Sequence, residues 1–450
     1  MNILTLTEYA ELRLGNEFGA DKKTVSKKQF AWLKQFNEDY KKRHHVAIFK
    51  YGWDDKTNTD TLIAQNFVGI IHLGNTIIEI LPKIEKIGNT ENIEPTIIRQ
   101  NLLKMLMISR NLNVLPGEIS STHSQDSFWD ILMHLFCKRL RQAITEGQIR
   151  RYEYQEDILP VLRGRLDIMR QIQLLPTQAH LLACRFDEFT LDTPINQILK
   201  ATLRIIASMA NNHKLQQSAH EMIVLFDEVS DIFPSALRWD RVFFDRLTTR
   251  YEPLLKIARM LIEKAPPDII TGNKTGFSIL FDMNKLFEEY IGTICQRLNS
   301  SERTIFTQEK SKYLLNKKKN KNTEETCFQL IPDIVVREKE TRKVSSILDT
   351  KWKVLDDNQN YNGVSQSDIY QMFAYSNRYQ ATKVILVYPY HKELSKDHIR
   401  DGIITTYYFE KKDDPNKESK QYIQIATVDL SDLGTVEKQL ETIIEQNPDS

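Results

Sequence analysis

Two short apolar segments joined by a charged turn constrain the fold of this 450-residue chain more than any other feature. Residues 331–336 read IPDIVV and residues 347–353 read ILDTKWK. In a β-strand, successive side chains alternate between faces with a rise of about 3.3 Å per residue, so Asp349 and Lys351 project from one face roughly 7 Å apart. If the two strands pair as a hairpin, Asp333 lies alongside Asp349 and two carboxylates share one surface.

The residue types on this surface predict metal-dependent hydrolysis. Hard divalent cations such as Mg²⁺ prefer oxygen ligands and keep several waters. A neighbouring lysine can orient or deprotonate the attacking water and offset charge on a phosphate. An Asp-x-Lys triplet alone is uninformative in a chain with this many charges, so the prediction depends on Pro332-Asp333 one hairpin upstream. The alternative is an edge hairpin whose exposed face happens to carry charges.

Composition narrows the classes of protein to consider. Lys and Arg together number 61 against 60 Asp and Glu, so the net charge is +1 and any surface for nucleic acid must be local. The four cysteines lack the spacing of a zinc site or a disulfide framework, which favours reduced thiols in a cytoplasmic protein. The N-terminus does not read as a signal peptide, and no apolar stretch approaches the roughly 18 residues of a membrane helix, so no membrane association is expected.

Length and residue patterns predict three domains. Residues 1–95 are expected to be β-rich after a short helical start. Residues 96–270 are expected to be mainly helical, including a helix that begins at Leu191-Asp192-Thr193-Pro194 and another over about 240–264. Residues 271–450 are expected to form a mixed sheet packed between helices.

The last domain is predicted in more detail. Its expected elements are a helix at 281–298, strands near 304–314, 327–337 and 345–353, a helix at 365–378, strands at 383–389, 404–411 and 421–428, and a C-terminal helix. Glu288 lies at the border of the buried stripe of the first helix and is a candidate site residue, a surface glutamate being the alternative. On the second helix Gln371 and Tyr375 lie one turn apart. Gln371 is expected to hydrogen-bond a phosphate or a bound water, unless this face only packs on the sheet.

Three further charged segments receive no firm role. Arg163-Gly164-Arg165 is expected either to meet a phosphate or an acidic partner, or to be a tight turn whose arginines pair with carboxylates such as Asp187 or Glu188. The lysine-rich residues 317–321 are expected to form an exposed hairpin tip, either a solvated loop or a finger that contacts phosphates. Residues 54–60 are expected to form a protruding loop.

The C-terminal part resembles the PD-(D/E)xK nuclease superfamily, which implies a restriction-endonuclease-like mixed sheet flanked by helices. The succession of motifs along the whole chain is similar to the McrC family, the nuclease subunits of McrBC-type restriction systems directed at 5-methylcytosine. Besides the nuclease core, the likeness is carried by residues 79–84, 162–166, 187–196 and 286–290. The lysine-rich segment and the 54–60 segment have no counterpart that we can assign in the family.

The resemblance implies a role for each candidate site residue. Asp333, Asp349 and the backbone carbonyl of Thr350 would bind Mg²⁺, or Mn²⁺ in its place. Lys351 would position the hydrolytic water. The supporting residues from the two neighbouring helices would be Glu288 and Gln371.

The resemblance also implies a division of labour between subunits. Members of the family dock through their N-terminal part, here residues 1–95, onto a hexameric AAA+ GTPase like McrB, stimulate its GTP hydrolysis and cut DNA. The partner recognises double-stranded DNA that contains a modified cytosine. This sequence has no G-x-x-x-x-G-K-[ST] loop, so GTP would be bound only by the partner. Two other functions stay open: a non-catalytic adaptor that activates an AAA+ motor, and a stand-alone DNA repair nuclease.

Overall fold

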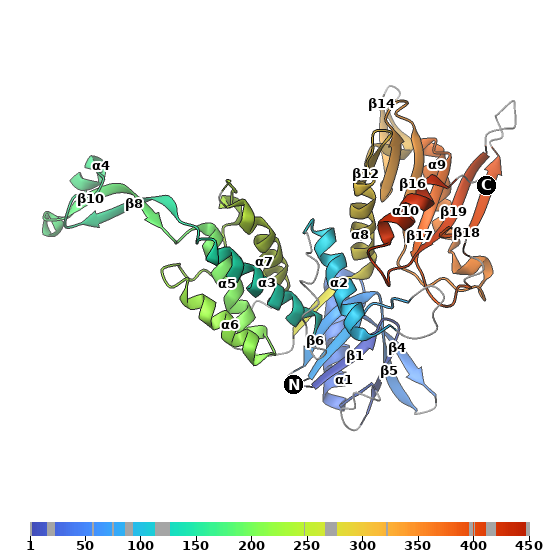
Figure 1. Ribbon diagram of the computed structural model, residues 1–450, viewed down its shortest axis with the longest axis horizontal. Helices are drawn as coiled ribbons and strands as arrows, with labels where there is room; N and C mark the ends of the chain where they lie inside the picture. Colours follow the sequence, from blue (N-terminus) through green and yellow to red (C-terminus); the bar gives the residue numbers. More distant parts are fainter. Residues whose placement is uncertain are drawn as a thin grey trace. The chain divides into compact units, whose positions relative to one another are not determined.

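The computed structural model of the protein describes residues 2–15, 23–55, 58–73, 76–85, 93–112, 127–246, 248–265, 277–320, 323–395, 399, 401–410 and 420–446. Contacts between Cα atoms divide the chain into two compact units. One unit comprises residues 1–124 and 280–450, and the other comprises residues 125–279. Helices and β-sheets occur in both units (Figure 1), so the predicted mixed α/β class is confirmed.

Two four-stranded sheets in the first unit are built mainly from N-terminal residues. One has the order β1-β7-β6-β11 and the other has the order β3-β2-β5-β4. Their strands are β1 (Asn2–Thr7), β2 (Glu11–Leu14), β3 (Thr24–Val25), β4 (Phe49–Asp54), β5 (Thr59–Ala64), β6 (Phe67–Leu73), β7 (Thr76–Leu81) and β11 (Phe277–Asp282). Helix α1 (Lys27–His44) begins at a capping box formed by Ser26 and Gln29, and packs Phe30 and Leu33 into the core that both sheets share. The predicted helical start is wrong, because β1 and β2 precede this helix.

A six-stranded mixed sheet forms the C-terminal part of the first unit. Its order is β12-β15-β16-β17-β19-β18, in which β16, β17 and β19 run parallel. The elements are β12 (Arg303–Thr307), β15 (Ile334–Glu338), β16 (Val344–Thr350), β17 (Lys383–Pro389), β18 (Ile403–Glu410), β19 (Lys420–Val428), α8 (Met283–Arg297), α9 (Gln366–Tyr379) and α10 (Val436–Glu445). Helix α9 packs Met372 and Tyr375 into a core with Ile347, Val384 and Leu386 of the sheet. Helices α8 and α10 contact each other and the sheet, and α2 (Pro95–Ser109) contacts α8 and β7. The sheet therefore has helices packed on it, as predicted.

Two of the predicted strands in this part are each split in two. Residues 304–314 divide between β12 and β13 (Lys312–Asn320), and residues 327–337 divide between β14 (Thr323–Leu330) and β15. Strands β13 and β14 form a separate two-stranded ribbon. The breaks have local causes, because Gln308 after β12 adopts a left-handed conformation with φ 51°, and Pro332 before β15 lacks a backbone donor.

The ribbon contains the lysine-rich segment. Lys317 and Lys318 lie on β13 opposite Glu325 and Glu324 of β14, near the end of an exposed β-hairpin, so the predicted hairpin is confirmed, with these two lysines on its strand and not in the connecting turn. Residues 321–322 lie outside the described part of the chain. The predicted 54–60 loop is the connection between β4 and β5, of which residues 56 and 57 also lie outside the described ranges.

The second unit contains a helical body. Its helices are α3 (Phe128–Thr145), α5 (Pro194–Met209), α6 (His213–Val224) and α7 (Glu252–Lys264). Thr193 caps α5 by accepting a hydrogen bond from the Asn196 N–H, and Pro194 occupies the first turn, so the predicted helix start is confirmed. The helix predicted over 240–264 is wrong in its first half, because α7 begins only at Glu252 after two 3-10 turns.

A β-sheet arm, residues 151–190, extends from this helical body (Figure 1). It consists of β8 (Arg151–Leu159), β9 (Arg165–Leu166), β10 (Leu182–Thr190) and the short helix α4 (Ile168–Ile172), with the strand order β8-β10-β9. The helical prediction is wrong for this segment. Many of its large apolar side chains are exposed, so neither a helical stripe nor a regular strand alternation marks it in the sequence.

The state of the cysteine thiols and the character of the helices can be compared with the predictions about redox state and membrane association. Cys137, Cys184 and Cys295 are buried and Cys327 is partly buried, and all four thiols are free, as predicted. None of the helices in the described ranges combines the length and the apolar character needed to cross a membrane. The cytoplasmic location stays a prediction.

Candidate active site

The hairpin of β15 and β16 brings the first two candidate carboxylates together. The strands are antiparallel, with Ile334 opposite Leu348, so Asp333 just before β15 comes beside the end of β16. One oxygen of Asp333, Oδ2, accepts hydrogen bonds from the backbone N–H and the hydroxyl of Thr350, both at 2.8 Å. The predicted juxtaposition of Asp333 with Asp349 is therefore present, and Thr350 holds Asp333 in place.

Lys351 lies against the buried carboxylate of Asp349. Asp349 is 2% exposed, and its Oδ2 lies 2.6 Å from Lys351 Nζ. The strand predicted to run to residue 353 ends at Thr350, but the backbone N–H of Lys351 still donates to the carbonyl of Val387 on β17 at 2.9 Å. This bond extends the pairing of β16 with β17 by one residue and fixes the backbone of Lys351.

Helix α9 adds Gln371 to the same group. Its Oε1 accepts a hydrogen bond from Lys351 Nζ at 3.1 Å, and its Nε2 lies 3.4 Å from Asp349 Oδ1. Nε2 also donates to the Tyr375 hydroxyl at 2.8 Å, which in turn donates to the carbonyl of Ile331 at 3.1 Å. Gln371 thus contacts both charged groups, and a chain of hydrogen bonds holds it against the segment before β15.

Helix α8 adds Glu288 to the group. The residue that connects Glu288 to the hairpin is Gln308, which the sequence did not indicate. Gln308 Nε2 donates to Glu288 Oε1 in a short contact and lies 3.4 Å from Asp333 Oδ1. The backbone N–H of Gln308 donates to the carbonyl of Asp333 at 2.9 Å. Gln308 therefore connects the glutamate of the helix with the aspartate of the hairpin. Nothing in the sequence around Gln308 marks this role.

Crowding of carboxylates in a buried place shifts their protonation. Burial, followed by repulsion from Asp333, raises the pKa of Asp349 to about 6. Burial, followed by repulsion from Asp333 and Asp349, raises the pKa of Glu288 to about 7. Burial also raises the pKa of Asp333, although the hydrogen bonds from Thr350 oppose this shift. The site holds protons more tightly than ordinary carboxylates do.

The single ammonium group in the cluster is firmly charged. Burial lowers the pKa of Lys351, but the neighbouring carboxylates, Asp349 first, outweigh this effect and leave the pKa raised. Asp349, Asp368 and Asp333 thus act on this one lysine. A set of converging oxygen ligands with surplus negative charge is the environment that a hard divalent cation prefers, so the residues present fit such an ion.

Arg163-Gly164-Arg165, the other basic candidate, lies in the arm of the second unit. Arg163 pairs with Glu188 at 3.1 Å and its guanidinium lies 4.3 Å from the ring centroid of Phe186. Gly164 has a φ of 68°, and a side chain there would collide with the backbone of Arg185. The local turn with a carboxylate partner is confirmed for Arg163.

Comparisons with known proteins extend over most of the chain. A family model described as McrBC 5-methylcytosine restriction system component matches residues 62–389. The type IV methyl-directed restriction enzyme EcoKMcrBC of Escherichia coli (strain K12) is 20% identical over 202 residues, which are 43% of this chain and about half, 55%, of that protein.

A solved structure shares the fold of this chain. A half-complex from a tetradecameric assembly of Thermococcus gammatolerans McrB AAA+ hexamers with bound McrC contains a chain that matches with a TM-score of 0.65 and 19% identity. The match covers 98% of this chain and 100% of that one. A cryo-EM structure of the T. gammatolerans McrBC complex matches with a TM-score of 0.47 and 22% identity, over 66% of this chain and 89% of that one.

Proposed function

Because this chain belongs to the family of McrBC 5-methylcytosine restriction system components, we propose that it is the DNA-cleaving subunit of such a system. The observation that carries the proposal is the cluster at the end of the β15–β16 hairpin. Asp333 and Asp349 converge there on one lysine, Lys351, which Gln371 contacts from α9, and Gln308 links Glu288 of α8 to Asp333. A partly buried set of carboxylates beside an oriented lysine is suited to phosphodiester hydrolysis.

In this proposal Asp333, Asp349 and the Thr350 carbonyl would hold Mg²⁺, with Mn²⁺ as an alternative. When bound, the ion would supply Lewis-acid stabilisation of the charge that develops on the phosphate. Lys351 orients the water that attacks in line with the leaving oxygen and offsets charge on the phosphate. Its own position is fixed by the 2.6 Å contact with Asp349 and by Gln371.

Glu288 has a different role in the proposal. Without a cation, burial and repulsion from Asp333 and Asp349 raise its pKa to about 7, and a bound cation would offset that repulsion. Gln308 aims the Glu288 carboxylate at the hairpin and keeps it beside Asp333. We therefore assign Glu288 to orienting the hydrolytic water beside Asp333, in support of Lys351.

The proposed partner is a hexameric AAA+ GTPase like McrB. The sequence has no Walker A loop of its own, and a chain of the same fold is called McrC bound to McrB AAA+ hexamers. In this proposal the partner hydrolyses GTP and recognises double-stranded DNA with a modified cytosine, and this chain stimulates the hydrolysis. Docking through residues 1–95 stays a prediction.

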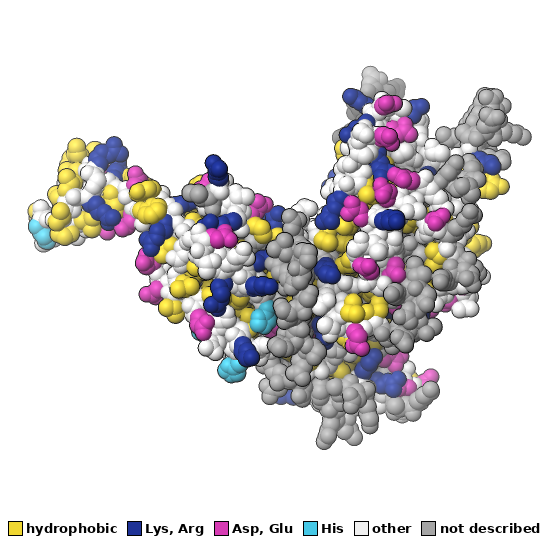
Figure 2. All heavy atoms as spheres, in the orientation of Figure 1, with side chains coloured by type: hydrophobic (Ala, Val, Ile, Leu, Met, Phe, Trp, Pro, Cys, Tyr) yellow, Lys and Arg dark blue, Asp and Glu magenta, His cyan; other side chains and the backbone are white. Residues whose placement is uncertain are grey.

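The arm is a second candidate for the docking surface. Its end exposes several large apolar side chains, which Figure 2 shows as a group: Val161, Leu162, Ile168, Met169, Ile172 and Leu175. Contiguous apolar patches on a protein surface usually mark places where another molecule binds. We propose that a protein partner covers this surface in the assembled system.

The decisive experiment measures cleavage and GTP hydrolysis together. The purified chain is mixed with its GTPase partner, GTP, Mg²⁺ and DNA that contains 5-methylcytosine. Lys351→Ala is expected to slow cleavage by about 10²–10⁴-fold while stimulation of GTP hydrolysis persists. Lys353→Ala is the matched control, because Lys353 pairs with Asp368 instead of Asp349 and should leave cleavage unchanged.

Three outcomes would contradict the proposal. Full cleavage by the Lys351→Ala protein would refute the assigned site. Stimulated GTP hydrolysis with no cleavage by the wild-type chain would indicate the adaptor. Mg²⁺-dependent cleavage that needs neither partner nor GTP would indicate the stand-alone nuclease.

A further inference from the structure

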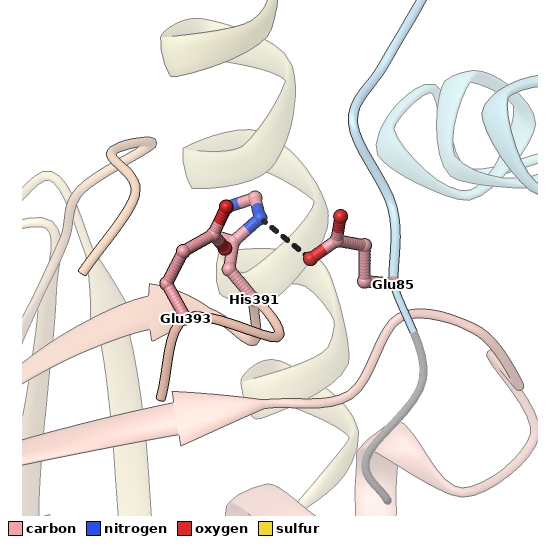
Figure 3. Close-up of side chains that lie close together, drawn as sticks. All are labelled: Glu85, His391 and Glu393. Atoms are coloured by element: carbon pink, nitrogen blue, oxygen red, sulfur yellow. Dashed lines mark ion pairs between the residues drawn. The ribbon is translucent and has the colours of Figure 1, made fainter. Parts of the chain in front are cut away.

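A group of side chains of the types that bind metals lies in the first unit, apart from the residues of the candidate active site. Glu85 follows β7, and His391 and Glu393 lie in the loop after β17 (Figure 3). Each offers one ligand atom, and these atoms all lie within 4.8 Å of one another. His391 Nδ1 points at Glu85 Oε2 across 3.8 Å. Segments from distant parts of the sequence therefore meet here.

Two buried atoms of this group have no hydrogen-bond partner. His391 is 2% exposed, and its Nδ1 makes no hydrogen bond. Glu393 Oε2 is buried and unpaired as well. Buried polar atoms are nearly always paired in folded proteins, so two unpaired atoms that face the same place indicate a missing ligand.

The imidazole is in the form that binds metals. Burial, followed by the nearby charge of Lys83, lowers the pKa of His391 to about 3. The ring is therefore neutral at physiological pH, and its approach to Glu85 is not an ion pair. A neutral ring nitrogen with a free lone pair is a common metal ligand.

Two lysines face the group but leave these atoms unpaired. Lys83 Nζ lies 2.8 Å from Glu393 Oε1 and 3.9 Å from Glu85 Oε1, and Lys392 Nζ lies 3.8 Å from Glu85 Oε1. Neither ammonium bonds His391 Nδ1 or Glu393 Oε2. The side chains of Lys83 and Lys392 are 23% and 50% exposed, so both can turn toward solvent when another cation enters.

We propose that Glu85, His391 and Glu393 form a binding site for a divalent transition metal, Zn²⁺ in the first place. One imidazole and two carboxylates match the ligands of Zn²⁺, whereas Mg²⁺ and Ca²⁺ take oxygen ligands. With bonds of about 2.0–2.2 Å, tetrahedral ligand atoms lie about 3.3 Å apart, so small side-chain rotations would close the present spacing. Water would fill the fourth position.

The site would act as a structural clip. Glu85 lies just after β7 of the first N-terminal sheet, and the other two ligands follow β17 of the six-stranded sheet. A metal would therefore tie the two sheets together within the same unit. Strand β17 pairs with β16, which carries Asp349, so the clip would also steady the loop at the end of a strand next to the candidate active site.

The test uses the full chain and Zn²⁺ alone as the probe. The protein is stripped with a chelator and titrated with Zn²⁺ by calorimetry, and bound zinc is counted after dialysis. Asp349→Asn serves as the background, so that zinc at the candidate active site is weakened. The Asp349→Asn protein is expected to bind one zinc ion more per chain than the double variant Asp349→Asn, Glu393→Gln. Zinc is also expected to raise the Tm of the single variant and not that of the double variant.

Two further variants make the result unambiguous. Lys392→Met should keep the zinc, since it removes only a neighbouring positive charge. His391→Gln should lose the zinc, and if that protein does not fold, Glu393→Gln decides, because its side chain is 32% exposed. Equal zinc content in the Glu393→Gln and Glu393-containing proteins would overturn the proposal. Retention of zinc by folded His391→Gln protein would do the same.

Discussion

The carboxylate cluster of the first unit and the arm of the second unit depart from ordinary protein surfaces in opposite ways. The cluster buries charge, since Asp349 is 2% exposed with two other carboxylates nearby. The arm exposes apolar groups, since Met169 and Ile172 are 71% and 75% exposed. Burying charge and exposing apolar surface both cost free energy in the isolated chain. In our proposals a ligand offsets this cost in each region, a cation in the cluster and a protein surface on the arm.

The two regions also differ in what holds them in shape. In the cluster, hydrogen bonds from Thr350, Gln308 and Gln371 connect the hairpin to the segment after β12 and to helix α9. The arm holds one ion pair with a buried carboxylate, Arg185 with Asp167, while others such as Arg163 with Glu188 are exposed, and exposed pairs contribute little to stability. The geometry of the cluster is therefore prearranged, whereas the arm depends on the pairing of β8 with β10.

The largest expected effect comes from removing the apolar character of the arm. Met169→Ser with Ile172→Ser should weaken binding to the GTPase partner about a thousandfold, if both residues contribute as interface anchors of about 2 kcal/mol each. Helix α4 has no buried residue, so the folded chain should be as stable as the wild type. Affinity measured by calorimetry or interferometry, together with GTP hydrolysis, gives the result.

A matched control exists in the same unit. Val224 at the end of α6 is 71% exposed, like Met169, but it lies outside the arm. Val224→Ser should leave binding unchanged. An equal loss with both variants, or no loss with the arm variant, would remove the arm from the docking surface and leave residues 1–95 as the predicted one.

A smaller effect is expected from the charge of the cluster. A carboxyl group whose pKa is raised in the folded protein contributes stability that is full below the unfolded pKa and is lost as the pH rises through the folded pKa. For Asp349 this window lies between its ordinary value of 3.8 and about 6. Since each pKa unit corresponds to about 1.4 kcal/mol, Asp349→Asn should stabilise the metal-free chain at pH 7.5 by on the order of 3 kcal/mol.

The same pair of proteins tests the need for a cation. Urea unfolding at pH 3.5 should show little difference between wild type and Asp349→Asn, because both side chains are neutral there. At pH 7.5 added Mg²⁺ should stabilise the wild type and not the variant. A wild-type chain that is as stable as the variant at pH 7.5 without metal would show that the buried charge carries no free-energy cost, and the contrast with the arm would fail.

The sequence predicted these two regions with very different success. Asp333, Asp349 and Lys351 could be found because strand alternation and a short hairpin fix their positions almost locally. Glu288 and Gln371 followed from helical spacing, which selects a face but not its neighbour. Gln308 could not be found, because its contacts depend on a left-handed residue after β12 that only the tertiary structure reveals.

The arm escaped prediction for a related physical reason. Periodicity reports which side chains are buried within the chain, and the apolar residues of the arm are exposed. For residues 163–165 of the arm, the sequence left two alternatives open, a contact with a phosphate or an acidic partner and a tight turn paired with local carboxylates. The group of Glu85, His391 and Glu393 was not visible at all, since no spacing rule connects the end of β7 with the loop after β17.

The smallest expected effect tests whether burial alone makes a carboxylate respond to a metal ion. Glu8 in the first unit is 2% exposed, accepts hydrogen bonds from Trp352 Nε1 at 3.0 and 3.1 Å, and accepts one from the Lys83 N–H at 3.1 Å. Burial raises its pKa to about 8. At pH 7 Glu8 is therefore mostly neutral, and Trp352→Phe should cost about 1 kcal/mol for the lost neutral hydrogen bond, beyond a packing loss that is the same at every pH.

Above pH 8 the same variant should cost more, about 2 kcal/mol, because Trp352 then donates to a charged carboxylate. Urea unfolding at pH 7 and pH 9 measures the difference, and Mg²⁺ should not change it, since Glu8 faces an indole and a backbone N–H and not a set of carboxylates. A destabilisation that is equal at both pH values would contradict the assigned protonation of Glu8. A destabilisation that Mg²⁺ abolishes would mean that buried carboxylates in this unit respond to the cation wherever they lie. The response to Mg²⁺ would then not distinguish the cluster around Asp349 from Glu8.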